Sequence, residues 1–323
     1  MIIPRPLLPG LRYLAEGGQE TELMYGHGFD LPEFALFPLL DNPAAAAKLT
    51  AMYRAVLDVA VRHRLGVLLG GLDYRASPDW AERLGFDAAQ LAEYQIRSID
   101  FLRQVSQPYR KRLPHILVAG CVGPQGDAYH RNEAVTETSA QAYHSTQMAN
   151  LAAADVDVVE AMTFTSAEEA IGVIRAARAH DLPIVVSFMI DSAGAADGSW
   201  SFRKMIETVD SATDGYALFY GINCSHPVEF EPQLAEPGEW LDRIGLLRPN
   251  ASAKDKTELC QIGHLERGDP ADLALRMERL AERMPDVRIW GGCCGTWDEH
   301  LERIAAAIGR VPMRPSARPR SLT

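Results

Sequence analysis

The feature that most constrains the fold is a regular alternation of short apolar segments with longer helical segments along the chain. Eight segments have the composition of β-strands, namely 13–18, 67–71, 115–120, 156–163, 183–190, 216–225, 246–252 and 287–292. Each precedes a segment with a helical pattern, and these are 41–66, 86–110, 132–154, 166–180, 201–210, 238–245, 269–284 and 296–309. Several strand segments are continuously apolar, as expected when both faces of a parallel sheet are buried.

Eight strand–helix units in 323 residues predict an α/β protein with the architecture of a (β/α)₈ TIM barrel. A doubly wound open sheet is the alternative. The barrel is expected to form a single domain over residues 1–309. The remaining segment, 310–323, is basic and rich in proline, so we interpret it as a loose end or as an arm that joins copies into a homo-oligomer.

The first long helix shows how the sequence marks the ends of its elements. Asp41 or Asn42 can accept hydrogen bonds from the first free amides of a helix, and Pro43 suits the first turn. Gly66 has the residue type that commonly ends a helix, so the helix is expected to extend to this position.

Composition narrows the class of protein. The net charge of −11 comes with no basic stripe, which argues against a nucleic-acid partner. No run of about 18 apolar residues is present, so no membrane-spanning helix is expected. The N-terminus lacks an uninterrupted apolar signal segment, and five cysteines in a long chain do not resemble a secreted disulfide framework. These features predict a cytoplasmic protein.

The segment WGGCCGT, which follows the eighth predicted strand, places Cys293 beside Cys294. A disulfide between neighbours would be strained, because successive Cα atoms are only ~3.8 Å apart. Two structural thiols in the core are one interpretation. A shared metal ion is the other, and it requires the backbone to leave strand geometry, which Gly291, Gly292 and Gly295 permit.

A metal site needs at least one further protein ligand, and the barrel indicates where to find it. Carboxyl ends of the strands meet at one face of such a barrel, where active sites lie. Cys224, in the segment GINCSHP, ends the sixth predicted strand and can therefore meet the cysteine pair. Three thiolates with an open fourth position fit a catalytic Zn²⁺. His226 is a weaker ligand candidate, and Cys121 is interpreted as an inert core thiol.

Here the chain resembles a known family. GINC at the end of the sixth strand and GGCCGT at the end of the eighth look like the zinc-binding motifs of the homocysteine S-methyltransferase family. The resemblance covers nearly the whole chain and includes EGGQETEL (16–23), GCVGPQGDAY (120–129) and VVEAMT (158–163). It implies Zn²⁺ bound by Cys224, Cys293 and Cys294 in a thiol methyltransferase barrel.

The same resemblance implies a set of substrate-binding residues. Glu160 matches the glutamate that holds the amino group of homocysteine in the family. Glu16, Gly17 and Gly18 match the acidic-glycine-glycine segment at the start of the family's sequences, where the acidic residue is more often aspartate than glutamate. Asn223 either orients Cys224 through a hydrogen bond or shapes the turn that follows the strand.

The chemistry that these residues suggest is consistent with physical principles. A thiol that binds zinc loses its proton, and the thiolate can attack a methyl group on a cationic sulfur or nitrogen. The expected partners are therefore small molecules: a thiol acceptor such as homocysteine, and an onium donor such as S-methylmethionine, betaine or S-adenosylmethionine.

Alternatives remain open at this stage. Many family members carry a Thr-Asn-Thr type segment after the second strand, where this chain has Asp73 and Tyr74. The acceptor could therefore be a thiol other than homocysteine. A zinc barrel that demethylates onium compounds or hydrolyses a substrate with zinc-bound water is a second possibility. A non-enzymatic thiol or metal sensor is the third.

Overall fold

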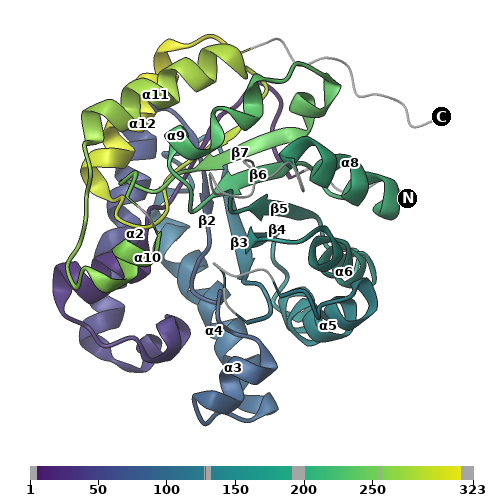
Figure 1. The fold of residues 1–323 in the computed structure, drawn as a ribbon. Helices are drawn as coiled ribbons and strands as arrows, with labels where there is room; N and C mark the ends of the chain where they lie inside the picture. Colours follow the sequence, from purple (N-terminus) through teal and green to yellow (C-terminus); the bar gives the residue numbers. More distant parts are fainter. Residues whose placement is uncertain (1–5, 127, 129–131, 191–200, 255, 314–323) are drawn as a thin grey trace.

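Eight parallel strands form a closed barrel in the order β1 to β8 (Figure 1). The computed structural model describes residues 6–126, 128, 132–190, 201–254 and 256–313, without the side chains of residues 256, 257 and 260. The strands are β1 Tyr13–Ala15, β2 Gly66–Leu69, β3 Ile116–Val122, β4 Val158–Phe164, β5 Ile184–Phe188, β6 Tyr220–Asn223, β7 Ile244–Arg248 and β8 Ile289–Trp290. Because β1 pairs with both β2 and β8, the predicted barrel is confirmed and the open sheet is wrong.

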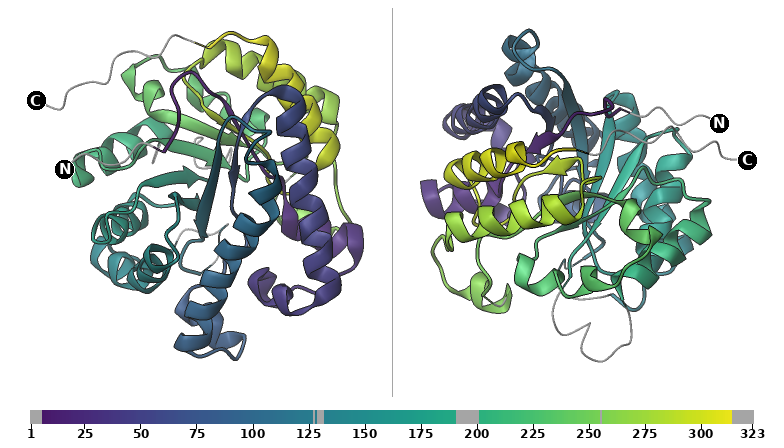
Figure 2. Two further views of the ribbon diagram at one scale, coloured as in Figure 1. Left: turned by 180° about the vertical axis from the view of Figure 1, so that it is seen from behind. Right: turned by 90° about the horizontal axis from the view of Figure 1, so that it is seen from above.

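Helices surround the barrel (Figure 2). The long ones are α2 Pro43–His63, α4 Ala88–Ser106, α5 Glu137–Ala153, α6 Ala167–Arg178, α8 Phe202–Thr213, α11 Pro270–Arg283 and α12 Asp298–Arg310. Short ones are α1 Gln19–Thr21, α3 Pro78–Arg83, α9 Pro227–Phe230 and α10 Lys256–Gln261. A π-helical turn spans Glu22–Gly26, and 3₁₀ turns span Pro32–Phe34, Phe37–Asp41, Gln107–Tyr109, Gln233–Ala235 and Glu239–Arg243. None of the described helices is long and apolar enough to cross a membrane.

The start of α2 is as predicted, but its end is not. Asn42 Oδ1 accepts hydrogen bonds from the amides of Ala44 and Ala45, at 3.0 and 3.3 Å. The helix ends at His63, because Arg64 takes a left-handed conformation with φ of 54°. Gly66 is instead the first residue of β2, and a Cβ there would lie 2.7 Å from the Tyr13 ring. This glycine serves close packing between strands.

The prediction around the seventh strand was also wrong in its boundaries. The segment expected to be a helix over 238–245 is a short 3₁₀ turn, Glu239–Arg243, and β7 begins directly after it at Ile244. The strand ends at Arg248, whereas 246–252 was predicted. The sequence pattern was misleading because an arginine is the last residue of an otherwise apolar strand.

Side chains fill the barrel toward the N-terminal ends of its strands, which leaves the C-terminal end for a site. A buried cluster takes one or two residues from each strand or from the residue just before it: Tyr13, Ala15, Leu68, Leu117, Ala119, Val158, Val185, Phe219, Leu246 and Ile289. Such layers are typical of this architecture. A larger apolar cluster packs the helices against the outside of the strands.

The C-terminal segment bears on the predicted domain boundary. Helix α12 continues to Arg310, one residue beyond the predicted end of the barrel. Residues 314–323 lie outside the described part of the chain, so a separate tail and its role as an oligomer arm stay predictions.

Candidate metal centre and substrate cavity

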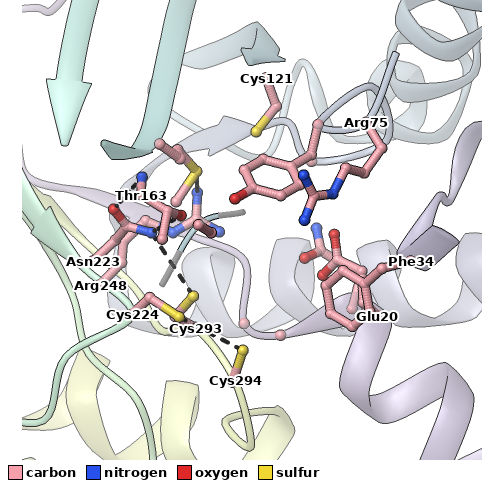
Figure 3. A pocket seen from close by; sticks show the side chains of 17 residues that line it. Glu20, Phe34, Arg75, Cys121, Thr163, Asn223, Cys224, Arg248, Cys293 and Cys294 are labelled. Atoms are coloured by element: carbon pink, nitrogen blue, oxygen red, sulfur yellow. Dashed lines mark hydrogen bonds between the residues drawn. The ribbon is translucent and has the colours of Figure 1, made fainter. Parts of the chain in front are cut away.

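Three cysteines meet at the C-terminal end of the barrel, as predicted. Cys224 directly follows β6, and Cys293 and Cys294 follow β8. Their three Sγ atoms lie within 4.8 Å of one another, and those of Cys224 and Cys294 are 3.8 Å apart. Figure 3 shows the three sulfur atoms together at one end of a cavity.

Unusual backbone geometry brings the thiols together. Cys224 has φ of 54°, in the left-handed region that a residue without glycine's freedom rarely adopts. Its carbonyl accepts a hydrogen bond from Asn250 Nδ2 at 3.1 Å, which holds this conformation. Gly295 has φ of 77°, and a Cβ at Gly292 would lie only 1.9 Å from Thr296 Oγ1. The predicted departure from strand geometry is therefore present, and these two glycines allow it.

The geometry of the cluster fits a tetrahedral metal ion. Bonds of about 2.3 Å to a tetrahedral zinc place two thiolates about 3.8 Å apart, and the Cys224–Cys294 separation of 3.8 Å equals this value. Cys121, Cys224, Cys293 and Cys294 form no disulfide. His226 is not part of the cluster, because its Nδ1 accepts the Val228 amide at the start of α9.

Asn223 is fixed by hydrogen bonds to Thr163 and approaches one thiol of the cluster. Its Oδ1 accepts the Thr163 amide at 2.8 Å, and its Nδ2 donates to Thr163 Oγ1 at 2.9 Å. The same Nδ2 lies 4.0 Å from the Sγ of Cys293. Two bonds to Thr163 fix the amide, so Asn223 is positioned to orient Cys293.

Gly17 and Gly18 let the chain after β1 approach the cysteine loop. A Cβ on Gly17 would lie 2.4 Å from the Thr296 carbonyl oxygen, and one on Gly18 would lie 2.6 Å from that of Cys293. The Gly18 amide donates to Thr296 O at 2.9 Å. Both glycines line the cavity, so the backbone is accessible to a ligand at this point.

Arg248, at the end of β7, is the main site residue that the sequence analysis missed. Its side chain is only 3% exposed and forms ion pairs with Glu16 Oε1 at 2.8 Å and Glu160 Oε1 at 3.3 Å. Its Nε donates to the Gly292 carbonyl at 3.2 Å, next to the cysteine pair. An arginine in an apolar strand of a barrel was the available signal, because a buried guanidinium requires anionic partners.

Glu16 and Glu160 are brought together by this arginine, but neither lines the cavity. Their side chains are 0% and 1% exposed. Burial raises the pKa of Glu160 to about 7, although the charge of Arg248 opposes that rise. In the structure the guanidinium thus occupies the position between the two carboxylates.

The residues that differ from the family pattern after β2 have separate roles. Asp73 is fully buried and accepts the Cys121 amide at 2.8 Å, so it joins this loop to β3 rather than facing the cavity. Burial raises its pKa to about 7. Tyr74 does line the cavity, as does Cys121, whose thiol has a pKa well above its usual value because of burial. Trp200, which follows the fifth predicted strand and is a sequence candidate for an aromatic wall beside a cationic methyl donor, lies outside the described residues.

The cavity has a volume of about 790 Å³ when the solvent at its open mouth is included. Besides the three cysteines, its lining includes the charged residues Glu20, Arg75 and Arg248 and the aromatic residues Phe34 and Tyr74. Glu20 and Arg75 were not identified from the sequence, since their convergence depends on loops far apart in the chain.

The fold and the site together define a closed parallel barrel with three thiols at the wall of a cavity. The chain belongs to the homocysteine S-methyltransferase family, whose model matches residues 17–308. It is therefore a thiol methyltransferase of the class that acts on homocysteine, which excludes the non-enzymatic sensor.

Solved structures agree with this fold. The oxidized form of the homocysteine methyltransferase MmuM from Escherichia coli is 22% identical, with a TM-score of 0.67 over 91% of this chain and 95% of that chain. Its metallated form is 20% identical, with a TM-score of 0.65 over 91% and 96%. No match was found among curated proteins.

Proposed function

We propose that the protein is a zinc-dependent S-methyltransferase that moves a methyl group from a small onium donor to homocysteine or a similar thiol. The observation that supports this most strongly is the group of three Sγ atoms within 4.8 Å at the wall of a cavity. Cys224, Cys293 and Cys294 would hold the ion, and the cavity would leave its fourth position open to the acceptor. The metallated form of the similar MmuM structure agrees with a metal in this fold.

Zinc is the ion that the donor set favours. Three soft thiolates select zinc over magnesium or calcium, which prefer oxygen ligands. Bound zinc would supply one function, the removal of the proton from an acceptor thiol at neutral pH. A reducing compartment such as the cytoplasm would keep these cysteines available, and we propose it for that reason.

The residues of the chain would perform the remaining tasks. Asn223 would hold Cys293, and Gly17 and Gly18 would let the backbone approach the acceptor. In the reaction the acceptor sulfur uses a lone pair to form a bond to the methyl carbon. The bond between that carbon and the donor sulfur or nitrogen breaks with its electron pair left on the donor, and the thiol proton passes to solvent. The enzyme must then align the two heteroatoms on opposite sides of the methyl group.

An onium donor fits the lining of the cavity. Phe34 and Tyr74 present aromatic rings to it, and aromatic faces attract cations. Phe34 also has φ of 61°, a conformation that costs free energy and is retained mainly at functional sites. S-methylmethionine, betaine and S-adenosylmethionine all carry the required cationic methyl group.

Glu160 and Glu16 are proposed to interact with the ammonium group of the acceptor, with Arg248 moving to admit it. Glu160→Gln keeps the shape and removes the charge. We expect kcat/KM for homocysteine to fall about ten- to a hundredfold, the worth of a hydrogen bond to a charged group. Bound metal, measured by elemental analysis, should not change.

4-Mercaptobutanoate, which is homocysteine without its amino group, is the matched control for this variant. Its kcat/KM should be the same in Glu160→Gln and in the unaltered protein. If the constant for homocysteine is also unchanged, Glu160 does not contact the ammonium and serves only to compensate the charge of Arg248.

A further inference from the structure

Two residues of opposite charge, Glu20 and Arg75, face the cavity at the end remote from the three clustered cysteines. Figure 3 shows Glu20 and Arg75 at this end, whereas Cys224, Cys293 and Cys294 lie at the other. Both residues belong to the cavity lining, and both are partly buried. Glu20 lies in the short helix α1 after β1, and Arg75 lies in the loop after β2, so the barrel topology brings them to one site.

Arg75 is held in place but keeps part of its hydrogen-bonding capacity. Its guanidinium stacks over Trp80, 4.2 Å from the ring centroid, and its Nη1 donates to the Gly126 carbonyl at 2.8 Å. Its Nε is buried and has no hydrogen-bond partner among the described residues. A guanidinium fixed in this way is preorganised to bind a carboxylate through two parallel bonds.

Glu20 is suited to bind a positively charged group. Removal from water makes its ionised form unfavourable, and burial raises its pKa to about 7. The charges of Cys293 and Glu16 act in the same direction, and Arg248 opposes them. A carboxylate in such surroundings becomes favourable when a ligand brings an ammonium group to it.

We propose that Glu20 and Arg75 bind the α-ammonium and α-carboxylate of the methyl donor, so that the enzyme selects an amino-acid sulfonium over donors without this headgroup. This inference rests on the proposed function. The acceptor sulfur must lie at the cysteines, and an in-line transfer places the donor beyond the methyl group, on the side away from them. The rest of the donor then extends toward Glu20 and Arg75. Glu16, Arg248 and Glu160 form an ion-pair network of their own, which the proposed function assigns to the acceptor.

The test compares S-methylmethionine with two analogues at saturating homocysteine, using the metal-loaded enzyme. 4-(Dimethylsulfonio)butanoate lacks the amino group, and 3-(dimethylsulfonio)propylamine lacks the carboxylate. Glu20→Gln should lower kcat/KM for S-methylmethionine about ten- to a hundredfold and leave the value for the butanoate unchanged. Arg75→Met should lower kcat/KM for S-methylmethionine by a similar factor and leave kcat/KM for the propylamine unchanged.

Two control variants separate ligand binding from structural effects. Arg83 stacks on the same Trp80 ring at 4.4 Å but does not line the cavity, so Arg83→Met should keep the selectivity for the donor headgroup. Glu33 is exposed beside Phe34, and Glu33→Gln should also have no effect. If Arg75→Met folds poorly, Arg75→Lys keeps the charge but loses the paired geometry. It should then show the same carboxylate-dependent loss to a smaller degree.

Three results would overturn the inference while leaving methyl transfer intact. Equal losses with all three donors would indicate a general defect, and no loss would show that the two residues do not bind the donor. A rise confined to the KM of homocysteine would assign the headgroup site to the acceptor. Absence of methyl transfer from every onium donor in metal-loaded, unaltered enzyme would instead reject the proposed function itself.

Discussion

Replacement of Cys224, Cys293 or Cys294 by serine is expected to empty the metal site and to abolish most methyl transfer. The three sulfur atoms form one cluster, so two remaining thiols cannot complete a site that needs three protein ligands. Activity should fall by more than about a hundredfold, because loss of a residue that only hydrogen-bonds to a metal ligand can already lower activity by about that factor. Elemental analysis after dialysis against dilute zinc, together with initial rates, measures both effects.

Cys121 provides the matched control for metal content. It also lines the cavity, but its thiol is not part of the cluster. Cys121→Ser should therefore bind about one zinc per chain, the content that the proposed function also predicts for the unaltered protein. If each single serine variant of the cluster still holds one zinc per chain, the ligands have been assigned wrongly.

Removal of Arg248 is expected to produce the largest loss of stability in the site. The guanidinium compensates two carboxylates that are 0% and 1% exposed. Breaking a buried ion pair by removal of one partner typically costs 3–5 kcal/mol, because an uncompensated charge remains. Arg248→Met should lower the free energy of unfolding by about that amount, as measured by urea denaturation.

The loss of stability in Arg248→Met is expected to depend on pH, and the pKa of Glu160 fixes the direction of this dependence. Burial already raises the pKa of Glu160 to about 7 with Arg248 present, and loss of the opposing positive charge raises it further. A carboxyl whose pKa is higher in the folded than in the unfolded state destabilises the fold as pH rises. The deficit of Arg248→Met should therefore be larger at pH 8 than at pH 5.

A double variant and a surface control complete that experiment. Addition of Glu160→Gln to Arg248→Met removes one of the two uncompensated charges and should recover part of the lost stability. Arg310→Met, which breaks an exposed ion pair with Glu278, should leave the urea midpoint nearly unchanged. A deficit that is the same at both pH values would mean that Arg248 contributes packing rather than charge compensation.

The barrel and the thiol cluster could be predicted because each depends on local patterns. Eight apolar segments alternate with helices, Cys224 directly follows one strand, and the Cys293–Cys294 pair comes soon after another. The carboxyl ends of the strands must meet in any such barrel, so these positions converge without knowledge of side-chain contacts.

The charged residues of the site could be predicted only in part, because their partners are set by long-range packing. Glu160 was identified, but its ion pair with Arg248 joins β4 to β7, and neither segment alone indicates which residue is the partner. The convergence of Glu20 and Arg75 on one cavity could not be predicted for the same reason. Gly66 was misassigned for a related reason: a glycine that ends a helix and one that packs against Tyr13 are identical in sequence.

The most direct test of the account is X-ray absorption at the zinc edge, with and without homocysteine. The proposed function requires that the acceptor sulfur takes the open position at the three cysteines. The free enzyme should show three sulfur neighbours and one lighter atom, and saturation with homocysteine should give four sulfur neighbours at about 2.3 Å. A coordination shell that stays the same at saturating homocysteine would contradict the claim that the metal activates the acceptor thiol.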